Sequence, residues 1–554
     1  MGHKHVFGID LGTTYSCISY IDEYGKPVVL KNSDGEHTTP SVVYMESKEN
    51  IIVGNEAKRS IEVESEKTIQ FIKRKMGKEK DTVEIGGTIY HAPEISAMIL
   101  KKVVNDANDD LKQQGIIKDG EEIKDVVITC PAYFGLKERD ATKTAGELAG
   151  LNVLSIINEP TAAAISYGIS GSDKEETVLV YDLGGGTFDI TIMNIKGASV
   201  TVVCTGGDDQ LGGKDWDEKF IEYINGKYSE EFGEDLSEDP EIMATLYLDA
   251  EVWKKSLTTR EKVNVTVNGP AGRMRMEVTR DEYENITREL LIRTKNLLDD
   301  VLTVAEKKGY SINKIDKILL VGGSSRMPQV SAMLQKEYNL TPVLADPDEA
   351  VAKGAAIFAI NEKAFNDFVM NEANKTGKTV EQLKDENVFT GEMDRKFSVS
   401  EASSIGGIKM NITNVLSRTY GIEAYDVYNK KRYISNMLMI NDELPAKVTE
   451  EYATIKNEQK GIVIKIYESR STAERIDIED KRPILQSEMH FIDKVPEGTK
   501  VEVTMSLDNS GILHLIAIEQ LYMSKLDATF DLANSLGESE KLAAVQRMNE
   551  AKIE

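Results

Sequence analysis

The chain has 554 residues and a formal net charge of −26, from 67 basic and 93 acidic side chains. This acidity disfavours a general nucleic-acid or anionic-membrane surface, because phosphate binding requires clustered lysine and arginine. Its three cysteines (Cys17, Cys130 and Cys204) have neither metal-ligand nor disulfide spacing, and no apolar run is long enough to span a membrane or act as a signal peptide. We therefore expect a cytoplasmic protein of three or four domains, at about 150 residues per domain.

The first informative motif is VFGIDLGTTYS, residues 6–16. An apolar strand ends at Asp10, and a turn containing Gly12, Thr13 and Thr14 follows it. Such a turn offers backbone N–H groups and hydroxyls to an anion, while the carboxylate suits a hydrated cation. Taken alone, the pattern is equally consistent with an ordinary hairpin.

A second copy of this pattern occurs in VLVYDLGGGTFDITIM, residues 178–193. The apolar strand ends at Asp182, and a glycine turn (Gly184, Gly185 and Gly186) leads to Thr187 and a return strand. Glycines lack a Cβ atom, so the backbone can approach phosphate closely. A third glycine turn, VGGSSRMP at 321–328, follows a strand and precedes a helix, which suits a phosphate at the helix N-terminus. The repeat predicts two facing lobes around one phosphate chain.

These motifs resemble those of the 70-kilodalton heat-shock chaperone family, whose ATPase domain has the actin-like fold. The resemblance rests on GIDLGTTYS, IKRKMG (72–77), CPAYFGLKERDATKTAGELAGL (130–151), INEPTAAAISYG (157–168), DLGGGTFD, LGGKDWD (211–217), VGGSSRMP and DPDEAVAKGAA (346–356). These segments keep the family's order from residue 5 to about residue 358. Further on, VPEGTKVEVTMSLDNSGILHLIA (495–517) resembles the end of the family's β-sandwich substrate-binding domain. The short segment between KRKMG and HAPEISAMIL resembles Gram-positive bacterial members, which suggests a bacterial origin.

The resemblance implies a site for ATP or ADP between the lobes, with Mg²⁺ and, as a second cation that it leaves open, K⁺. The implied catalytic residues are Lys73, Asp10, Glu159, Asp182 and Thr187, and three of them (Asp10, Glu159 and Asp182) would hold Mg²⁺ largely through water. The implied nucleotide-binding residues are Gly12, Thr13, Thr14, Tyr15, Gly184, Gly185, Gly186, Gly212, Gly213, Glu251, Lys254, Lys255, Thr258, Gly322, Gly323, Ser324, Arg326 and Asp348.

Residue chemistry alone leaves two of these assignments open. Glu159 could be an acid at a helix start, and Lys73 could belong to a solvated basic face. Lys255 also departs from the family, which usually has arginine there. Arginine stacks a planar cation on adenine, whereas lysine offers a point charge, so we expect lower nucleotide affinity.

We predict an α/β two-lobed actin-like ATPase domain (1–360), an insert and linker (361–411), a β-sandwich peptide-binding domain (412–532) and a short, truncated C-terminal helix (533–554). In the insert, Gly377 breaks the helical pattern and Thr379 is a plausible N-cap. A tolerated surface excursion is the favoured interpretation of the insert, and a docking element is the alternative. We expect no helical lid.

The segment NITNVLSRTYGIEAYD is expected to replace the family's leucine-rich linker, with Val415 and Leu416 as its adjacent aliphatic residues. Pro131 and Arg139 stand at positions where the resemblance implies a relay between domains. In the sandwich, the candidates for a peptide pocket or for the core beneath it are Ile462, Ile464, Ile466 and Tyr467, and core is the safer assignment for each.

The predicted function is an ATP-dependent chaperone that hydrolyses ATP and binds extended apolar segments of unfolded polypeptides. The resemblance also implies a J-domain co-chaperone and a nucleotide-exchange factor as partners, and no nucleic acid or membrane. The alternative is a non-cycling ATP-binding adaptor that holds one protein partner. A metabolite kinase of the same superfamily is disfavoured by the β-domain.

Overall fold

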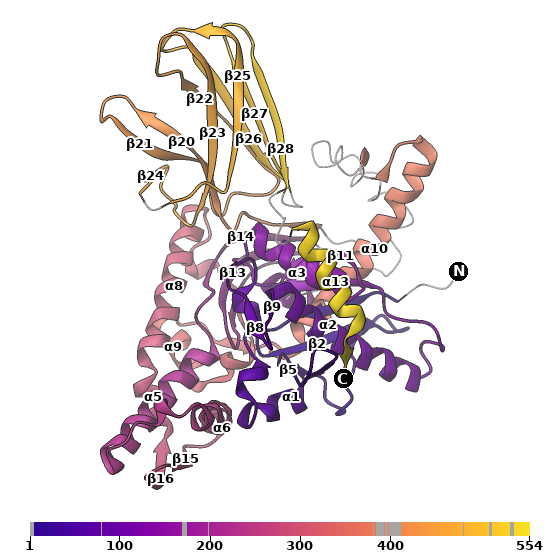
Figure 1. Cartoon of the computed structure of the whole chain (residues 1–554), viewed down its shortest axis with the longest axis vertical. Coiled ribbons are helices and arrows are strands. Elements are labelled where there is room, and N and C mark those ends of the chain that lie inside the picture. The colour runs from indigo at the N-terminus through magenta and orange to yellow at the C-terminus, as the bar shows by residue number, and fades with distance from the viewer. Residues whose placement is uncertain are drawn as a thin grey trace.

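The computed structural model describes residues 5–78, 80–168, 174–197, 199–380, 382–383, 393, 397, 411–479, 481–508, 512–531 and 537–554. Two α/β lobes form the body of the molecule, and an antiparallel β-sandwich stands on them (Figure 1). No helix in this described part of the chain is long and apolar enough to cross a bilayer. The architecture agrees with the predicted fold class: a two-lobed α/β region, then an antiparallel β region and a C-terminal helix.

The first lobe is built on a sheet with strand order β11-β10-β1-β2-β3, and β4 pairs with β2. Strand β1 runs parallel to β10 and forms an antiparallel hairpin with β2, which places Asp10 opposite Cys17. The strands are β1 (Phe7–Asp10), β2 (Tyr15–Ile21), β3 (Pro27–Val29), β4 (Thr39–Pro40), β10 (Asp125–Cys130) and β11 (Asn152–Asn158).

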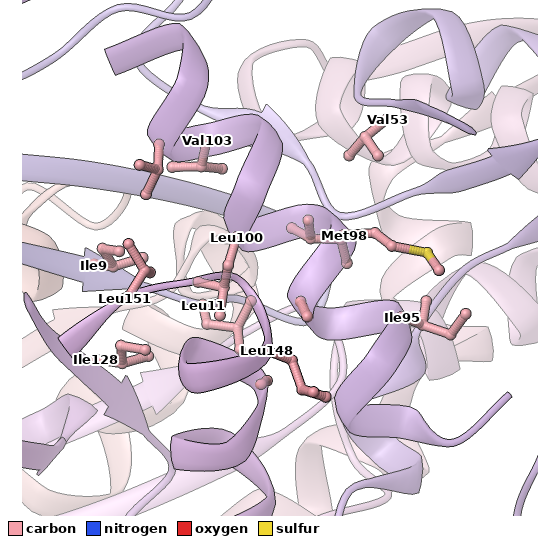
Figure 2. Packing of buried hydrophobic residues seen from close by; sticks show 14 of the residues in the cluster. Ile9, Leu11, Val53, Ile95, Met98, Leu100, Val103, Ile128, Leu148 and Leu151 are labelled. Atoms are coloured by element: carbon pink, nitrogen blue, oxygen red, sulfur yellow. The ribbon is translucent and has the colours of Figure 1, made fainter. Parts of the chain in front are cut away.

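Helices α2 (Ala92–Gln113) and α3 (Leu136–Leu148) pack on this sheet, and their apolar side chains share one core with it. Figure 2 shows this core, in which Leu100 of α2 lies between Ile9 and Ile128 of the sheet on one side and Ile95 and Met98 of α2 on the other. We call it the first-lobe core. Every residue of α2 from Ala92 to Leu100 is buried, whereas farther along the helix the buried apolar residues recur at helical spacing (Val103, Val104, Ala107 and Leu111).

A smaller sheet of the first lobe has the order β29-β6-β5-β7. Its strands are β5 (Val43–Met45), β6 (Asn50–Val53), β7 (Thr68–Ile69) and β29 (Lys552–Ile553). The other elements of the lobe are α1 (Asn55–Arg59), the 3₁₀ turns η1 (Ser60–Glu62), η2 (Ser65–Lys67) and η3 (Ile72–Lys75), and the hairpin β8 (Val83–Ile85) and β9 (Thr88–Tyr90).

The second lobe repeats the plan with the strand order β18-β17-β12-β13-β14-β19. Its strands are β12 (Glu175–Leu183), β13 (Phe188–Lys196), β14 (Ser199–Asp208), β17 (Lys317–Val321), β18 (Pro342–Leu344) and β19 (Asn411–Thr413), with a separate hairpin β15 (Lys262–Gly269) and β16 (Gly272–Thr279). Its helices are α5 (Gly213–Phe232), α6 (Pro240–Thr259), α7 (Arg280–Ile286), α8 (Arg288–Lys307) and α9 (Pro328–Tyr338), with the 3₁₀ turns η4 (Leu236–Glu238), η5 (Ile312–Lys314) and η6 (Gly323–Arg326). The β12–β13 hairpin repeats β1–β2 and sets Asp182 opposite Asp189.

Helices α4 (Glu159–Gly168) and α10 (Ala350–Thr376) lie at the junction of the two lobes and bury apolar residues from both. Their crossing requires glycine: a Cβ on Gly354 would lie 1.7 Å from Ala162 O. Similarly, a Cβ on Gly8 of β1 would lie 2.1 Å from Ala356 N. Such close contacts fix the distance between the lobes at the base of the cleft.

The β region consists of two antiparallel sheets, β24-β21-β20-β23-β25 and β22-β26-β27-β28. The strands are β20 (Thr419–Asp426), β21 (Lys431–Leu438), β22 (Ala446–Ala453), β23 (Gln459–Ser469), β24 (Arg475–Asp477), β25 (Leu485–Val495), β26 (Lys500–Leu507), β27 (Ile512–Glu519) and β28 (Lys525–Asp531). Both sheets contribute to one core. Ile464 and Ile466 are buried in it and Ile462 is half-buried, whereas Tyr467 is buried with its hydroxyl 3.1 Å from Glu423 Oε2.

The expected boundary at residue 360 falls inside helix α10, which continues to Thr376. Gly377 ends this helix in the left-handed conformation, with φ of 72°, as its place in the sequence predicted. Thr379 Oγ1 accepts a hydrogen bond from Gln382 N at 3.1 Å, so the predicted N-cap is present. Most of the predicted insert after residue 383 lies outside the described residues.

The prediction that Val415 and Leu416 belong to the linker is wrong. Val415 forms a bridge with Glu443, and Leu416 lies in the sandwich core, so both belong to the β region. The segment that joins the sheet of the second lobe is β19, in which Ile412 pairs with Val200 of β14 and packs on the core between the lobes. A pair of adjacent aliphatic residues does not mark this linker, because a three-residue strand needs only one apolar contact to hold it.

Candidate functional site

A cavity of about 660 Å³ lies between the two lobes and brings together almost all of the predicted site residues. These lining residues are Asp10, Gly12, Thr13, Thr14, Tyr15, Lys73, Glu159, Asp182, Gly184, Gly185, Thr187, Gly213, Glu251, Lys254, Lys255, Thr258, Gly322, Gly323, Ser324, Arg326 and Asp348. Gly186 and Gly212 lie just behind the lining, where a Cβ on Gly212 would be 2.6 Å from the backbone of Gly186.

The β1–β2 and β12–β13 turns face each other across this cavity. A Cβ on Gly185 would lie 2.4 Å from Thr14 Cγ2, and one on Gly186 would lie 2.3 Å from Thr13 Cγ2. Only glycine therefore allows the two turns to approach this closely. The result is a cradle of backbone groups and threonine hydroxyls, which has the chemistry of a phosphate site.

Lys73 and Glu159 form a buried ion pair at the floor of the cleft. Lys73 Nζ also donates to Leu11 O at 2.5 Å. Burial alone would lower the pKa of Lys73, but Glu159 and Asp10 outweigh it and raise this pKa above its ordinary value. Lys73 thus carries a positive charge in the cleft, and the prediction of a solvated basic face does not describe it.

Asp10 and Asp182 stand beside this pair as two further carboxyl groups. Burial and the neighbouring Glu159 raise the pKa of Asp10 to about 7, and the same two causes raise the pKa of Asp182 well above its ordinary value. Asp10 Oδ1 accepts a hydrogen bond from Thr129 Oγ1 at 3.0 Å. Three carboxyl groups facing one ammonium group form a donor set that favours an additional cation.

This donor set fits a hydrated cation better than a dehydrated one. Among the described residues, no group of three histidine, cysteine, aspartate or glutamate side chains is arranged to ligate one metal ion directly. Mg²⁺ retains several of its water ligands in most protein sites. The arrangement therefore suits Mg²⁺ held through water.

A second polar cluster joins the lobes over the outer part of the cleft. Lys58 Nζ of the first lobe lies 2.5 Å from Glu251 Oε2 of the second lobe and 2.9 Å from Tyr15 OH. Lys255 Nζ lies 2.7 Å from Glu251 Oε1. Burial would raise the pKa of Glu251, but Lys58 and Lys255 dominate and lower it to about 2.

The other predicted nucleotide contacts lie on the second-lobe wall. Lys254 Nζ lies 2.7 Å from Asp217 Oδ2 and 2.9 Å from Gly213 O. Burial raises the pKa of Asp217 to about 6, although Lys254 opposes this shift. Arg326 pairs with Asp348, while the Thr258 hydroxyl donates to Lys255 O within its own helix at 2.6 Å. The Thr258 hydroxyl therefore already has a hydrogen-bond partner within its own helix.

Sequence reasoning missed several charged groups of the site, among them Lys58 and Asp217, which line the cavity, and Asp189, which does not. Lys58 belongs to no glycine or aspartate motif, so nothing in the sequence around it indicates a role in the site. Asp217 ends the motif LGGKDWD, and Asp189 ends DLGGGTFD, so both stood within motifs but were not selected. Asp189 Oδ1 accepts a hydrogen bond from Tyr133 N at 3.3 Å, and burial and Glu159 raise its pKa well above the ordinary value.

Comparison with known proteins decides the family. The family profile described as "Hsp70 protein" matches residues 6–86, 79–405 and 406–554. The chain belongs to the Hsp70 family. Similar curated relatives of this Hsp70 chain include the chaperone protein DnaK of Mycoplasma mobile, 35% identical over 549 residues, which cover 98% of this chain and 80% of the relative. DnaK of Thermotoga petrophila is 36% identical over 530 residues, which cover 93% and 78% of the two chains. DnaK of Thermosipho africanus is 35% identical over 523 residues, with the same coverage.

Proposed function

We propose that this Hsp70-family chain binds ATP or ADP in the cleft and hydrolyses ATP as a chaperone. The observation that carries this proposal is the meeting of Lys73, Asp10, Glu159 and Asp182 between the two glycine turns. Phosphoryl transfer depends on charge neutralisation and alignment rather than on covalent catalysis, and these groups supply both.

In this proposal, the Gly12–Tyr15 and Gly184–Thr187 turns hold the β- and γ-phosphates. Bound Mg²⁺ would neutralise phosphate charge, and Asp10, Glu159 and Asp182 would hold it through water. Lys73 stays protonated beside Glu159, so it can stabilise the transferring phosphoryl group and orient the attacking water. The Thr187 hydroxyl positions the phosphate. A second cation, K⁺, remains part of the proposal without a residue assignment.

We further propose that the sandwich binds extended apolar segments of unfolded polypeptides. The β20–β21 and β22–β23 loops lie at the same end of one sheet, because β20 and β23 are antiparallel neighbours. These loops and their flanks expose Tyr425, Val427, Tyr428 and Ile455. Exposed apolar side chains beside a sheet suit an extended peptide. A J-domain co-chaperone and a nucleotide-exchange factor would serve the same cycle as partners.

The test is ATP hydrolysis by the full chain, measured with and without a permanently unfolded polypeptide, together with nucleotide binding by titration. Hydrolysis that the polypeptide stimulates would support the chaperone proposal. Nucleotide binding without turnover would instead favour the adaptor that holds one partner. Absence of nucleotide binding would refute both.

A further inference from the structure

The segment 537–554 leaves the sandwich and returns to the first lobe of the nucleotide region. Helix α13 (Glu538–Glu550) lies beside α2 and α3, and β29 follows it into the small sheet (Figure 1). The returning segment is far in sequence from the lobe on which it packs. Three independent kinds of contact hold it there.

The first kind of contact is apolar. Ala544 and Met548 of α13 are 0% and 2% exposed, and both belong to the first-lobe core defined above. On another side of the same helix, Leu542 and Val545 are 70% and 43% exposed. The helix therefore inserts one face into the core of the lobe rather than resting on its surface.

The second kind of contact is an ion pair between Arg547, which is partly exposed, and the buried carboxylate of Glu94. Arg547 Nε and Nη2 lie 2.9 Å and 2.6 Å from Glu94 Oε2 of α2, and Glu94 is 1% exposed. The Arg547 guanidinium also lies 5.7 Å from the centre of the Tyr90 ring. Without Arg547, the Glu94 carboxylate would be buried without its cation, which is a strongly unfavourable state.

The third kind of contact is a strand pairing. Strand β29 runs parallel to β6, with Lys552 opposite Asn50 and Ile553 opposite Ile51. Lys552 N donates to Glu49 O at 2.8 Å, Glu554 N donates to Ile51 O at 2.9 Å, and Val53 N donates to Glu554 O at 2.9 Å. This pairing covers a strand edge that would otherwise have unpaired backbone groups.

We propose that residues 537–554 are a constitutive part of the first lobe, so that the β-sandwich is an insertion tethered at both of its ends. One tether follows β19, and the other is residues 532–536. Five residues span at most about 18 Å, at up to about 3.6 Å per residue. The sandwich therefore cannot move far from the lobes while both tethers hold.

The seat of this segment is separate from the nucleotide cleft. Its partners Glu49, Ile51, Val53, Glu94 and Tyr90 do not line the cavity between the lobes. Because none of these residues would contact a bound nucleotide directly, we expect the second tether to hold in every nucleotide state, and the inference does not depend on ATP hydrolysis.

Hydrogen exchange of the full chain, with and without ATP, tests the proposal. The amides of Val53, Lys552 and Glu554 should exchange at least about 100-fold more slowly than in an unstructured peptide, in both conditions. Lys552→Pro removes one ladder N–H group and should abolish protection of β29 and of Val53. Lys552→Ala keeps that N–H group and should retain the protection. Unprotected amides in the wild-type chain, or protection that ATP changes more than tenfold, would overturn the proposal.

A cleavage experiment tests the tether without any substitution in the seat. A protease recognition sequence replaces residues 532–536 of the full chain, and the protein is cut after folding. The fragment that begins at residue 537 should remain bound during gel filtration. Val545→Asp should leave this retention unchanged, whereas Met548→Asp should release the fragment. Release of the fragment from the otherwise unsubstituted chain would refute a constitutive seat.

Discussion

The floor of the cleft holds the charge that the proposed chemistry needs, and Lys73 is its positive member. We predict that Lys73→Ala lowers single-turnover ATP hydrolysis by about 10²–10³, the usual loss for one electrostatic contact to a transition state. Lys75→Ala is the matched control, because Lys75 Nζ donates to Thr82 O instead of facing the carboxylates. Nucleotide titration and thermal unfolding of both variants separate catalysis from binding and folding. Equal hydrolysis rates in the two variants would remove Lys73 from the site.

Glu251 gives a prediction about pH. Its folded-state pKa is about 2, below the ordinary 4.5, so its ionisation stabilises the fold above about pH 4.5 and this contribution disappears as the pH falls toward 2. Glu251→Gln should lower the Tm at pH 7 by at least about 2 °C, because Lys58 and Lys255 lose their partner. The difference between the two proteins should shrink below pH 4.5. Differential scanning fluorimetry from pH 8 down to about pH 2.5 measures it, and a difference that grows on acidification would contradict the assignment.

At the residue scale, sequence predicted the parts of the site that carry a local signature. Asp10 and Asp182 follow apolar strands and precede glycine turns, so their common location could be expected. Lys58 could not, since its role depends on Glu251, which lies 193 positions away. Which lysine reaches the cleft depends on how the two lobes contact each other in the folded chain. The spacing of residues along the sequence does not show that contact.

At the element scale, β19 connects the sandwich to the second lobe, and we predict that this strand carries the coupling between them. Ile412→Asp should place a charge against the core between the lobes and detach the strand. We expect unfolded polypeptide to stimulate hydrolysis by at most a few-fold in the wild-type chain, because so short a strand buries little apolar area. Ile412→Asp should abolish the stimulation and leave basal hydrolysis intact.

The conservative variant Ile412→Val is the control for this prediction, since it keeps an apolar side chain on β19. Hydrolysis is measured in steady state over a range of polypeptide concentrations. Stimulation that survives Ile412→Asp would show that another contact transmits the signal. Substitution of Leu416 could not make this test, because Leu416 lies in the sandwich core and its loss would disturb the sandwich itself.

The length of a strand decides whether the sequence predicts it, as the β12–β13 hairpin and the short strands β19 and β29 show. The β12–β13 hairpin alternates over long apolar runs, so its two strands could be read from the sequence. Strands β19 and β29 have three and two residues, too few for a periodicity. Each exists because a distant strand edge accepts it, and neither its existence nor its partner could be inferred locally.

At the scale of the whole molecule, the sandwich meets the nucleotide region largely through polar contacts, with Leu136 of α3 packed against the sandwich core. Ser417 Oγ donates to Phe134 O at 2.9 Å, and Asn441 Oδ1 accepts from Thr205 N at 2.8 Å. Arg418 lies between the two regions, 3.4 Å from Glu138 of α3 and 3.5 Å from Glu468 of β23. Interfaces of this polar kind within one chain permit relative movement of the domains.

Arg418 is the residue on which this interface should depend most. Its side chain is 10% exposed, and it neutralises two carboxylates that belong to different regions. Burial raises the pKa of Glu468, and Arg418 is the foremost of the groups that oppose this shift, ahead of Tyr420 and Lys137. Arg418→Met should remove the cation that lies between these two carboxylates and weaken the contact between the sandwich and α3.

We predict that Arg418→Met increases the radius of gyration in small-angle X-ray scattering only slightly in the intact chain, because the second tether at residues 532–536 still holds the sandwich near the lobes. The same substitution in the chain cut within 532–536 should give a much larger increase, since only β19 then restrains the sandwich. Arg432→Met is the control, because Arg432 is exposed and pairs with Glu423 inside the sandwich. Equal expansion of the intact and cut Arg418→Met proteins would mean that the second tether does not restrain the sandwich. This conclusion would hold whether or not the chain binds or hydrolyses nucleotide.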